Sequence, residues 1–319
     1  MGEYGGAVVN TVLLCPGQGA QRVGMGKDLA AEFPEARHVF EQVDDALGVS
    51  LSSLMWNGPE EELTLTHNAQ PAILAHTLAA CAVLGDSFSP AAGAGHSLGE
   101  YSAYVVAGAL EIVDAAHLVR RRGELMLEAG KQRPGTMTAV LGLDSARVEA
   151  VCAECSRDDA VVVAANINAP DQTVISGDPD AVKEAGALCK AAGAKRVMPL
   201  KVSGAFHSPL MVPAQAGLHA ELKAVSFSDP KFPVITNATA EPVSDSETAR
   251  LRLDEQLTSP VRWVASMRRA AEVCGEKTRF VEVGPGKVLS GLVKRIVAGA
   301  LTVSLGTAED LRGFLEEAE

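Results

Sequence analysis

Apolar positions in the first part of the chain fall into short runs separated by segments with helical spacing. Residues 8–15 form an apolar, partly β-branched run that ends at Pro16-Gly17, and residues 91–95 form another. Short apolar runs bounded by turn residues predict strands buried in a parallel sheet. Helical spacing is found around them, in residues 26–47, 71–84, 98–110 and 114–129. This alternation of strands and helices predicts an α/β domain.

The middle of the chain follows a different order of elements. Strand-like and helical patterns there succeed one another as β-α-β-β-α-β, in residues 137–143, 145–156, 160–166, 172–176, 179–192 and 196–202. This order is that of the ferredoxin-like arrangement. Gly135 and Gly204 bracket the region as expected hinges. We therefore predict a small inserted subdomain at residues 135–201.

The α/β pattern resumes after the insertion. Apolar strands and amphipathic helices alternate in residues 213–223, 233–237, 261–274, 279–283 and 288–297. Helices that connect apolar strands predict a parallel sheet with crossover connections. We assign residues 1–134 and 202–319 to one large α/β domain.

Composition and charge exclude several classes of protein. Of 319 residues, 47% are hydrophobic and 21% are charged, which argues against a disordered chain. The chain has 28 Lys and Arg against 40 Asp and Glu, for a net charge of −12. A general nucleic-acid binder is not expected, because phosphate affinity needs clustered cations.

The lack of a recognisable signal peptide or membrane span, together with the cysteine spacing, predicts a cytoplasmic protein. Glu3 precedes the first apolar run where a signal peptide would carry positive charge. Residues 63–85 lack Asp, Glu, Lys and Arg, but their polar residues make a poor membrane span. The six cysteines are spaced irregularly, so we expect no disulfide framework. Cys152 and Cys155 form an isolated C-x-x-C, which we interpret as two thiols on a helix rather than a metal or redox site.

The strongest chemical signal is Gly95-His96-Ser97-Leu98-Gly99, a G-x-S-x-G between a predicted strand and a predicted helix. Its glycines allow a sharp turn from which Ser97 projects. The backbone N–H of Leu98 would then lie at a helix N-terminus, where a developing negative charge is stabilised. The alternative is a glycine-flanked serine that only caps the helix.

A serine nucleophile needs a base, and the chain has seven histidines. His207 is the preferred candidate, because it lies in a loop after a strand, where α/β folds carry their chemistry. The other histidines fit helix surfaces, core or loop positions. Pro16-Gly17-Gln18-Gly19 fails as a dinucleotide fingerprint or P-loop, but it can point the N–H of Gln18 toward the same site. Gly284-Pro285-Gly286 follows the last predicted strand in a similar way, or forms a simple turn.

Taken together, these motifs resemble the malonyl-CoA:acyl-carrier-protein transacylase family, including the acyltransferase domains of polyketide synthases. The resemblance covers nearly the whole chain and rests on Pro16-Gly17-Gln18-Gly19-Ala20-Gln21, Gly95-His96-Ser97-Leu98-Gly99-Glu100, Arg121-Arg122-Gly123, Asn166-Ile167-Asn168-Ala169-Pro170, Gly204-Ala205-Phe206-His207, Ser259-Pro260-Val261-Arg262-Trp263 and Glu282-Val283-Gly284-Pro285-Gly286. It implies a hydrolase-like α/β domain with a ferredoxin-like insertion.

The resemblance also implies a Ser–His dyad at Ser97 and His207. Gln18 and Leu98 match the backbone donors of the oxyanion hole, and Gln256 matches the residue whose carbonyl orients the histidine ring. Ser259 departs from the family, in which relatives often have Asn.

Substrate selection is assigned to Arg122, which matches the family's carboxylate clamp. Without the resemblance, Arg122 would be interpreted as one exposed residue of a run of three arginines. Phe206 resembles the malonyl type, because its ring leaves less room for a methyl branch. The remaining expected substrate-binding residues are Met126, His96 and Asn168.

The implied reaction moves a malonyl group from malonyl-CoA to the phosphopantetheine thiol of an acyl carrier protein, through an acyl-serine. No metal or organic cofactor is expected, and a monomer is the simplest expectation. Three alternatives stay open: a hydrolase of acyl carrier proteins, a non-catalytic scaffold, and a trans-acting polyketide acyltransferase with another acyl group. Fatty acid and polyketide synthesis are both compatible with the sequence. Carrier proteins are typically acidic, so a cationic rim is expected among Lys190, Lys195, Arg196, Lys287, Lys294 and Arg295.

Overall fold

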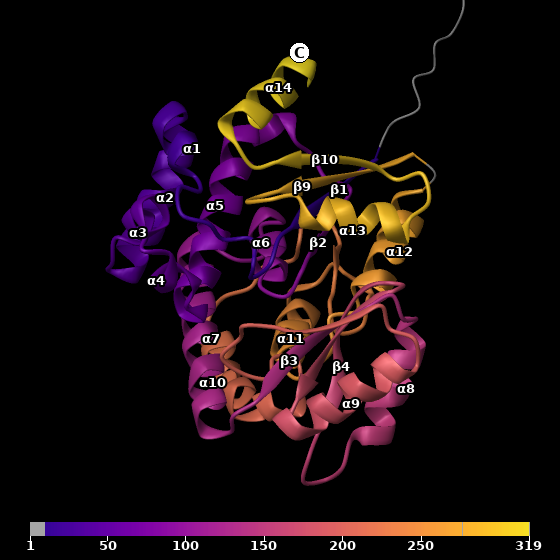
Figure 1. Ribbon diagram of the computed structural model, residues 1–319. Helices are drawn as coiled ribbons and strands as arrows, with labels where there is room; N and C mark the ends of the chain where they lie inside the picture. The colour runs from indigo at the N-terminus through magenta and orange to yellow at the C-terminus, as the bar shows by residue number, and fades with distance from the viewer. Residues whose placement is uncertain (1–9, 276, 319) are drawn as a thin grey trace, which may run out of the picture.

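The larger of two sheets has six strands in the order β10-β9-β1-β2-β7-β8 (Figure 1). The computed structural model describes residues 10–275 and 277–318. All neighbouring strands in this sheet are parallel except β7 and β8. The strands are β1 (Asn10–Cys15), β2 (Ala92–Gly95), β7 (Val234–Ile235), β8 (Pro242–Val243), β9 (Thr278–Val283) and β10 (Leu301–Leu305). The predicted parallel α/β architecture is confirmed.

Strand β1 is buried on both faces because its side chains alternate between two cores. Leu13 and Cys15 pack on one face, while Val12 and Leu14 pack on the other. The core on the first face is shared with helices from both halves of the chain: α2 (Pro34–Leu47), α5 (Thr66–Leu84), α6 (Gly99–Val106), α7 (Ile112–Gln132) and α10 (Val212–Ala224), of which α5 and α6 contact the sheet directly. The second is covered by α12 (Trp263–Cys274) and α13 (Val288–Ile296).

The second sheet is antiparallel, with strand order β4-β5-β3-β6. Its elements are β3 (Thr136–Leu141), α8 (Ser145–Cys155), β4 (Val162–Ala169), β5 (Gln172–Gly177), α9 (Pro179–Ala191) and β6 (Arg196–Pro199). This order is the predicted ferredoxin-like one. Val261, just before α12, forms an isolated bridge to β4: its N–H donates to the Ala165 carbonyl at 2.8 Å, and its carbonyl accepts from the Ile167 N–H at 2.9 Å. The domain boundaries at residues 135 and 201 stay a prediction.

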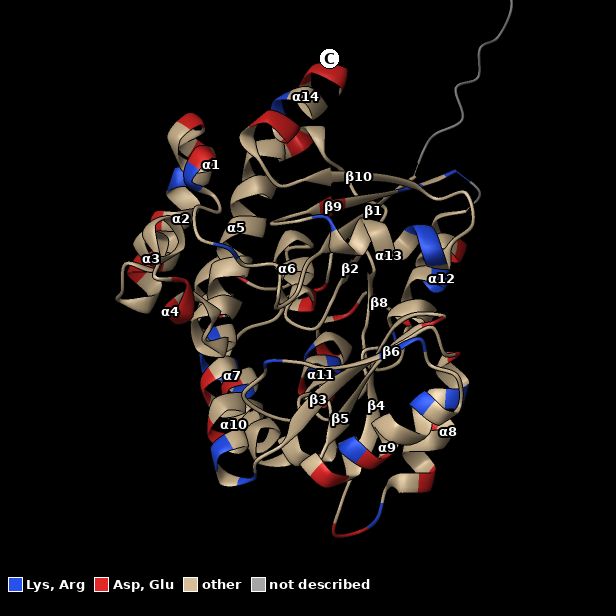
Figure 2. Cartoon of the chain, in the orientation of Figure 1, with Lys and Arg blue, Asp and Glu red and all other residues tan. Residues whose placement is uncertain are grey.

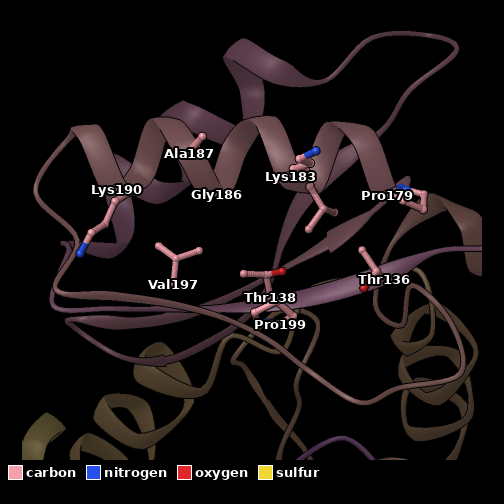
Figure 3. A pocket seen from close by; sticks show the side chains of 10 residues that line it. Thr136, Thr138, Pro179, Lys183, Gly186, Ala187, Lys190, Val197 and Pro199 are labelled. Atoms are coloured by element: carbon pink, nitrogen blue, oxygen red, sulfur yellow. The ribbon is translucent and has the colours of Figure 1, made fainter.

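Helix α9 covers the outer face of the small sheet. A cavity of about 390 Å³ lies between α9 and strands β3 and β6, with Thr138 and Val197 on its floor and Lys183 and Lys190 along the helix (Figure 3). Side chains of β3 alternate, so Met137 and Ala139 point to the opposite face and join the main core. The cavity therefore opens away from that core.

Several elements differ from the sequence prediction. Residues 26–47 form two helices, α1 (Lys27–Glu32) and α2, because Pro34 starts a new helix after the extended Phe33. The expected strand at residues 196–202 ends at Pro199. Residues 8 and 9 of the first predicted strand lie outside the described residues. The prediction also missed α3 (Leu51–Asn57), α4 (Glu60–Thr64), α11 (Ser246–Gln256), α14 (Ala308–Ala318), β8 and β10.

Charged residues are spread over the surface rather than gathered on one element. Figure 2 shows Lys and Arg on several helices, with acidic residues prominent on α4 and α14. Among the described residues, no helix combines the length and apolar character needed to cross a bilayer. Nor do His, Cys, Asp and Glu side chains of these residues gather in a group of three or more that could hold a metal ion.

Candidate active site

Ser97 lies in a tight turn between β2 and α6. Its φ is 51°, in the left-handed region that costs an ordinary L-residue about 1–2 kcal/mol. The flanking glycines make the turn possible: a Cβ at Gly95 would lie 1.9 Å from the Gly99 carbonyl carbon, and one at Gly99 would lie 2.0 Å from the Cys15 oxygen. The turn therefore packs tightly against the end of β1, and the Ser97 side chain projects from it.

The structure brings Ser97 and His207 together across 110 residues of sequence. The Ser97 hydroxyl lies 2.7 Å from His207 Nε2. On the other side of the ring, Nδ1 lies 3.1 Å from the Gln256 carbonyl and 3.2 Å from the Ser259 carbonyl. Because both carbonyls can only accept, Nδ1 carries the proton and Nε2 is free to accept one.

His207 is held neutral by its surroundings. Its side chain is 3% exposed. Burial, followed by the charge of Arg122, lowers the pKa of His207 to about 3. A neutral imidazole beside a hydroxyl is the state that a general base requires.

Arg122 is a buried cation at the same hydroxyl. Its side chain is 1% exposed, and its Nη2 donates to Ser97 Oγ at 3.0 Å and to Gln256 Oε1 at 2.9 Å. Nη1 donates to Gln70 Oε1 at 2.7 Å. Burial lowers the pKa of this guanidinium, and the nearby Tyr101 and Glu100 oppose that shift. No carboxylate oxygen of residues 10–275 or 277–318 lies within 4.0 Å of it, so its charge is solvated by amides and hydroxyls.

The Gln18 loop packs directly on the serine turn. A Cβ at Gly17 would lie 2.3 Å from the His96 carbonyl oxygen, so only glycine lets the two segments approach so closely. The Gln18 side chain is anchored by donating to Thr66 Oγ1 at 3.2 Å. This packing brings Gly17, the neighbour of Gln18, against His96, the neighbour of Ser97. The roles of the Gln18 and Leu98 N–H groups as oxyanion donors stay predictions.

Two cavities adjoin the Gln18–Gly19 backbone. One, of about 220 Å³, is lined by loop residues, by His96 and Asn168, and by α13 through Val288, Leu289 and Leu292. The other, of about 550 Å³, lies between α4, the start of α5 and residues 200–203. Both are therefore lined by the loop that packs against the serine turn.

The other expected substrate-binding residues are distributed around this centre. His96 Nε2 lies 2.8 Å from Asn168 Oδ1, which links the serine turn to β4. Met126 accepts from Gln70 Nε2 at 3.3 Å, one contact away from Arg122. Phe206 precedes His207 and is 6% exposed. Their roles toward a substrate stay predictions.

Sequence analysis missed three buried polar residues at this site. Gln70 accepts a hydrogen bond from Arg122, and Asn237 accepts one from the Ser97 N–H. Glu100 accepts one from the side chain of Gln256. Burial raises the pKa of Glu100 to about 7. Glu100 follows the G-x-S-x-G motif directly and was the one detectable signal, since an acidic residue in such an apolar helix must find partners.

The cysteines do not enter the site. All six are free. Cys152 and Cys155 lie on α8 in the core of the small sheet, and burial raises the pKa of both thiols.

Comparison with known proteins places the chain in a family. Residues 12–316 match the model described as acyl transferase domain. The chain is 44% identical over 299 residues to the malonyl CoA-acyl carrier protein transacylase of Bacillus subtilis, covering 93% of this chain and 94% of the relative. The corresponding protein of Staphylococcus aureus is 40% identical over 306 residues, covering 96% and 98%.

Solved structures agree with this placement. An acyl carrier protein S-malonyltransferase from Vibrio cholerae superposes with a TM-score of 0.91 at 40% identity, covering 95% of this chain and 99% of that one. A malonyl-transacylase in complex with a type II PKS acyl-carrier protein superposes with a TM-score of 0.92 at 40% identity, covering 97% and 99%. The resemblance inferred from the motifs is confirmed: the chain belongs to the acyl transferase domain family.

Proposed function

We propose that this chain transfers a malonyl group from malonyl-CoA to the phosphopantetheine thiol of an acyl carrier protein, through a malonyl ester on Ser97. One observation carries the proposal: the Ser97 hydroxyl lies within hydrogen-bond distance of both a neutral imidazole and a buried cation. The first activates the hydroxyl, and the second suits an acyl group that ends in a carboxylate.

In the first half-reaction, Ser97 Oγ attacks the thioester carbonyl and passes its proton to His207 Nε2. The oxyanion is stabilised by the N–H groups of Gln18 and Leu98, each worth about 3–4 kcal/mol in sites of this type. The C–S bond then breaks, and CoA leaves as a thiol with the proton from His207. The second half-reaction reverses these steps, with the carrier-protein thiol attacking the ester.

Arg122 would hold the malonyl carboxylate. Its Nη2 already contacts Ser97 Oγ, so the carboxylate of a short diacyl group on that oxygen can reach the guanidinium. A substrate anion would also pair a buried charge that amide groups now solvate, and such bidentate pairing is strong and directional.

The carrier protein needs a complementary surface near the cavities. Lys190 is used within the fold, because its Nζ donates to the Ala194 and Lys195 carbonyls at 3.2 and 2.9 Å. Arg295 pairs with Asp171. We therefore centre the proposed rim on Lys287 and Lys294, since Lys287 adjoins the cavity residue Val288.

The proposed chemistry uses only side chains and backbone groups, so no metal or organic cofactor is needed. We also propose a cytoplasmic location, in keeping with six free thiols.

Intact-mass measurement tests the function. The protein incubated with malonyl-CoA should gain one malonyl group, and Ser97→Ala should gain none. Added acyl carrier protein should then collect the group. Release as free malonate would instead favour the hydrolase, a preference for another acyl-CoA would favour the alternative acyltransferase, and no labelling would favour the scaffold.

A further inference from the structure

Asn237 lies just beyond the end of β7 and clamps the serine turn. Its side chain is fully buried. Oδ1 accepts from the Ser97 backbone N–H at 2.6 Å, and Nδ2 donates to the Gly95 carbonyl at 2.6 Å. The amide thus bridges the backbone on both sides of His96. A carboxamide offers a donor and an acceptor side by side at every pH, which this pair of bonds requires.

This clamp acts on one of the two left-handed backbone positions of the site, Ser97 at φ 51° and His207 at φ 55°. Ser97 is one of the non-glycine residues with positive φ in the described chain. A non-glycine residue keeps this backbone conformation only when several surrounding contacts hold it there. The two bonds of Asn237 fix the orientation of the peptide groups that enter and leave His96, and with them the direction of the Ser97 side chain.

The clamp is connected to the base as well. The Asn237 backbone N–H donates to Glu100 Oε2 at 3.0 Å, and Gln256 Nε2 donates to the same oxygen at 2.8 Å. Gln256 Nε2 also donates to the Ser97 carbonyl at 3.0 Å. The Gln256 carbonyl in turn contacts His207 Nδ1. One set of buried groups therefore sets the position of nucleophile and base relative to each other.

We propose that Asn237 is a positioning residue for acyl transfer, which holds the Ser97 turn so that Oγ is aimed at His207. The inference deepens the proposed function, because it concerns the same serine. It predicts an effect on the reactivity of Ser97 and none on substrate affinity, since the hydrogen bonds of the Asn237 side-chain amide go to the backbone of the turn.

The test compares Asn237→Leu with a matched variant, Thr236→Val. Thr236 is the buried neighbour, and its hydroxyl bonds Thr239 Oγ1 at 2.8 Å and the Glu241 carbonyl at 3.3 Å rather than the serine turn. Each protein is reacted with malonyl-CoA and with a fluorophosphonate, a serine-directed probe that needs no malonyl recognition. Labelling rates are followed by intact mass, and melting temperatures are measured in parallel.

We expect Asn237→Leu to lower the maximal labelling rate with both probes by about a hundredfold, the cost of a small misplacement of a reacting group. The half-saturating malonyl-CoA concentration should stay unchanged, and Thr236→Val should keep the parental rate. Asn237→Ala removes both bonds without adding bulk, so it should also lower the rate by about a hundredfold, equivalent to two hydrogen bonds.

Parental labelling rates in folded Asn237→Leu would overturn the inference, as would an equal loss in Thr236→Val at the same melting temperature. If Asn237→Leu does not fold, parental reactivity of Asn237→Ala overturns it. A parent protein that reacts with the fluorophosphonate but not with malonyl-CoA contradicts the proposed function alone, and the fluorophosphonate rates then still decide the role of Asn237. A parent that neither probe labels overturns both.

Discussion

Replacing Arg122 by alanine should abolish the preference for a carboxylate-bearing acyl group. The guanidinium can offer a malonyl carboxylate two charge-assisted hydrogen bonds, each worth about 1.5–3 kcal/mol. Their loss amounts to about 3–6 kcal/mol, or a factor of about 10² to 10⁴ in the ratio of kcat/KM for malonyl-CoA to that for acetyl-CoA. Acetyl transfer should be retained better, because a neutral acyl group makes no use of the charge.

The same substitution has a structural cost that must be separated from selectivity. It leaves the side-chain oxygens of Gln70 and Gln256 without the donors they now have, at about 1–3 kcal/mol for each buried group. Arg121→Ala is the matched control, since Arg121 is the neighbouring residue and its side chain pairs with Glu124 on the surface. Melting temperatures define the range in which each variant is folded.

The assay is rapid quenching followed by intact mass, with malonyl-CoA and acetyl-CoA at several concentrations. A folded Arg122→Ala protein with the parental ratio of malonyl to acetyl rates would refute the carboxylate role. So would a control variant that loses the preference equally.

Three further predictions follow from particular contacts. Gly99→Ala should destabilise the protein by about 1–3 kcal/mol through overpacking, because its Cβ would lie 2.0 Å from the Cys15 oxygen; an unchanged melting temperature would contradict the close approach. Burial lowers the pKa of His76 to about 4, so the unfolded chain binds this proton more readily, and stability present above pH 6.5 should be lost as the pH falls toward 4. His76 alone should lower the free energy of unfolding by about 2 kcal/mol between pH 7 and pH 5. In His76→Gln, the urea midpoints at these two pH values should therefore differ by less than in the parent protein. Transfer to the carrier protein should slow as ionic strength rises, and Lys287→Ala with Lys294→Ala should flatten that dependence; a rate that ignores salt would argue against the proposed rim.

The sequence predicts those features of the site that depend on local backbone geometry. The G-x-S-x-G turn needs glycine at two places because neighbouring backbone fills the space of a Cβ, and this requirement is visible as residue identity. The parallel sheet and the ferredoxin-like insertion were predicted because apolar periodicity reports burial. Residues 26–47 show the limit of this kind of prediction. Their apolar residues keep helical spacing throughout, although Pro34 starts a separate helix.

The sequence alone predicted a serine nucleophile, and it determined the class of fold and, through motif resemblance, the family. The resemblance predicted that Ser97 and His207 pair, and the structure gives the distance of 2.7 Å. Only the tertiary structure decided which further distant groups meet: Gln70 beside Arg122, and Asn237 across the serine turn. Asn237 and Gln70 carry no local pattern of their own, because an amide is ordinary in any loop or helix. Their roles arise from packing, which removes water, so that these buried amides must find their hydrogen-bond partners elsewhere in the chain.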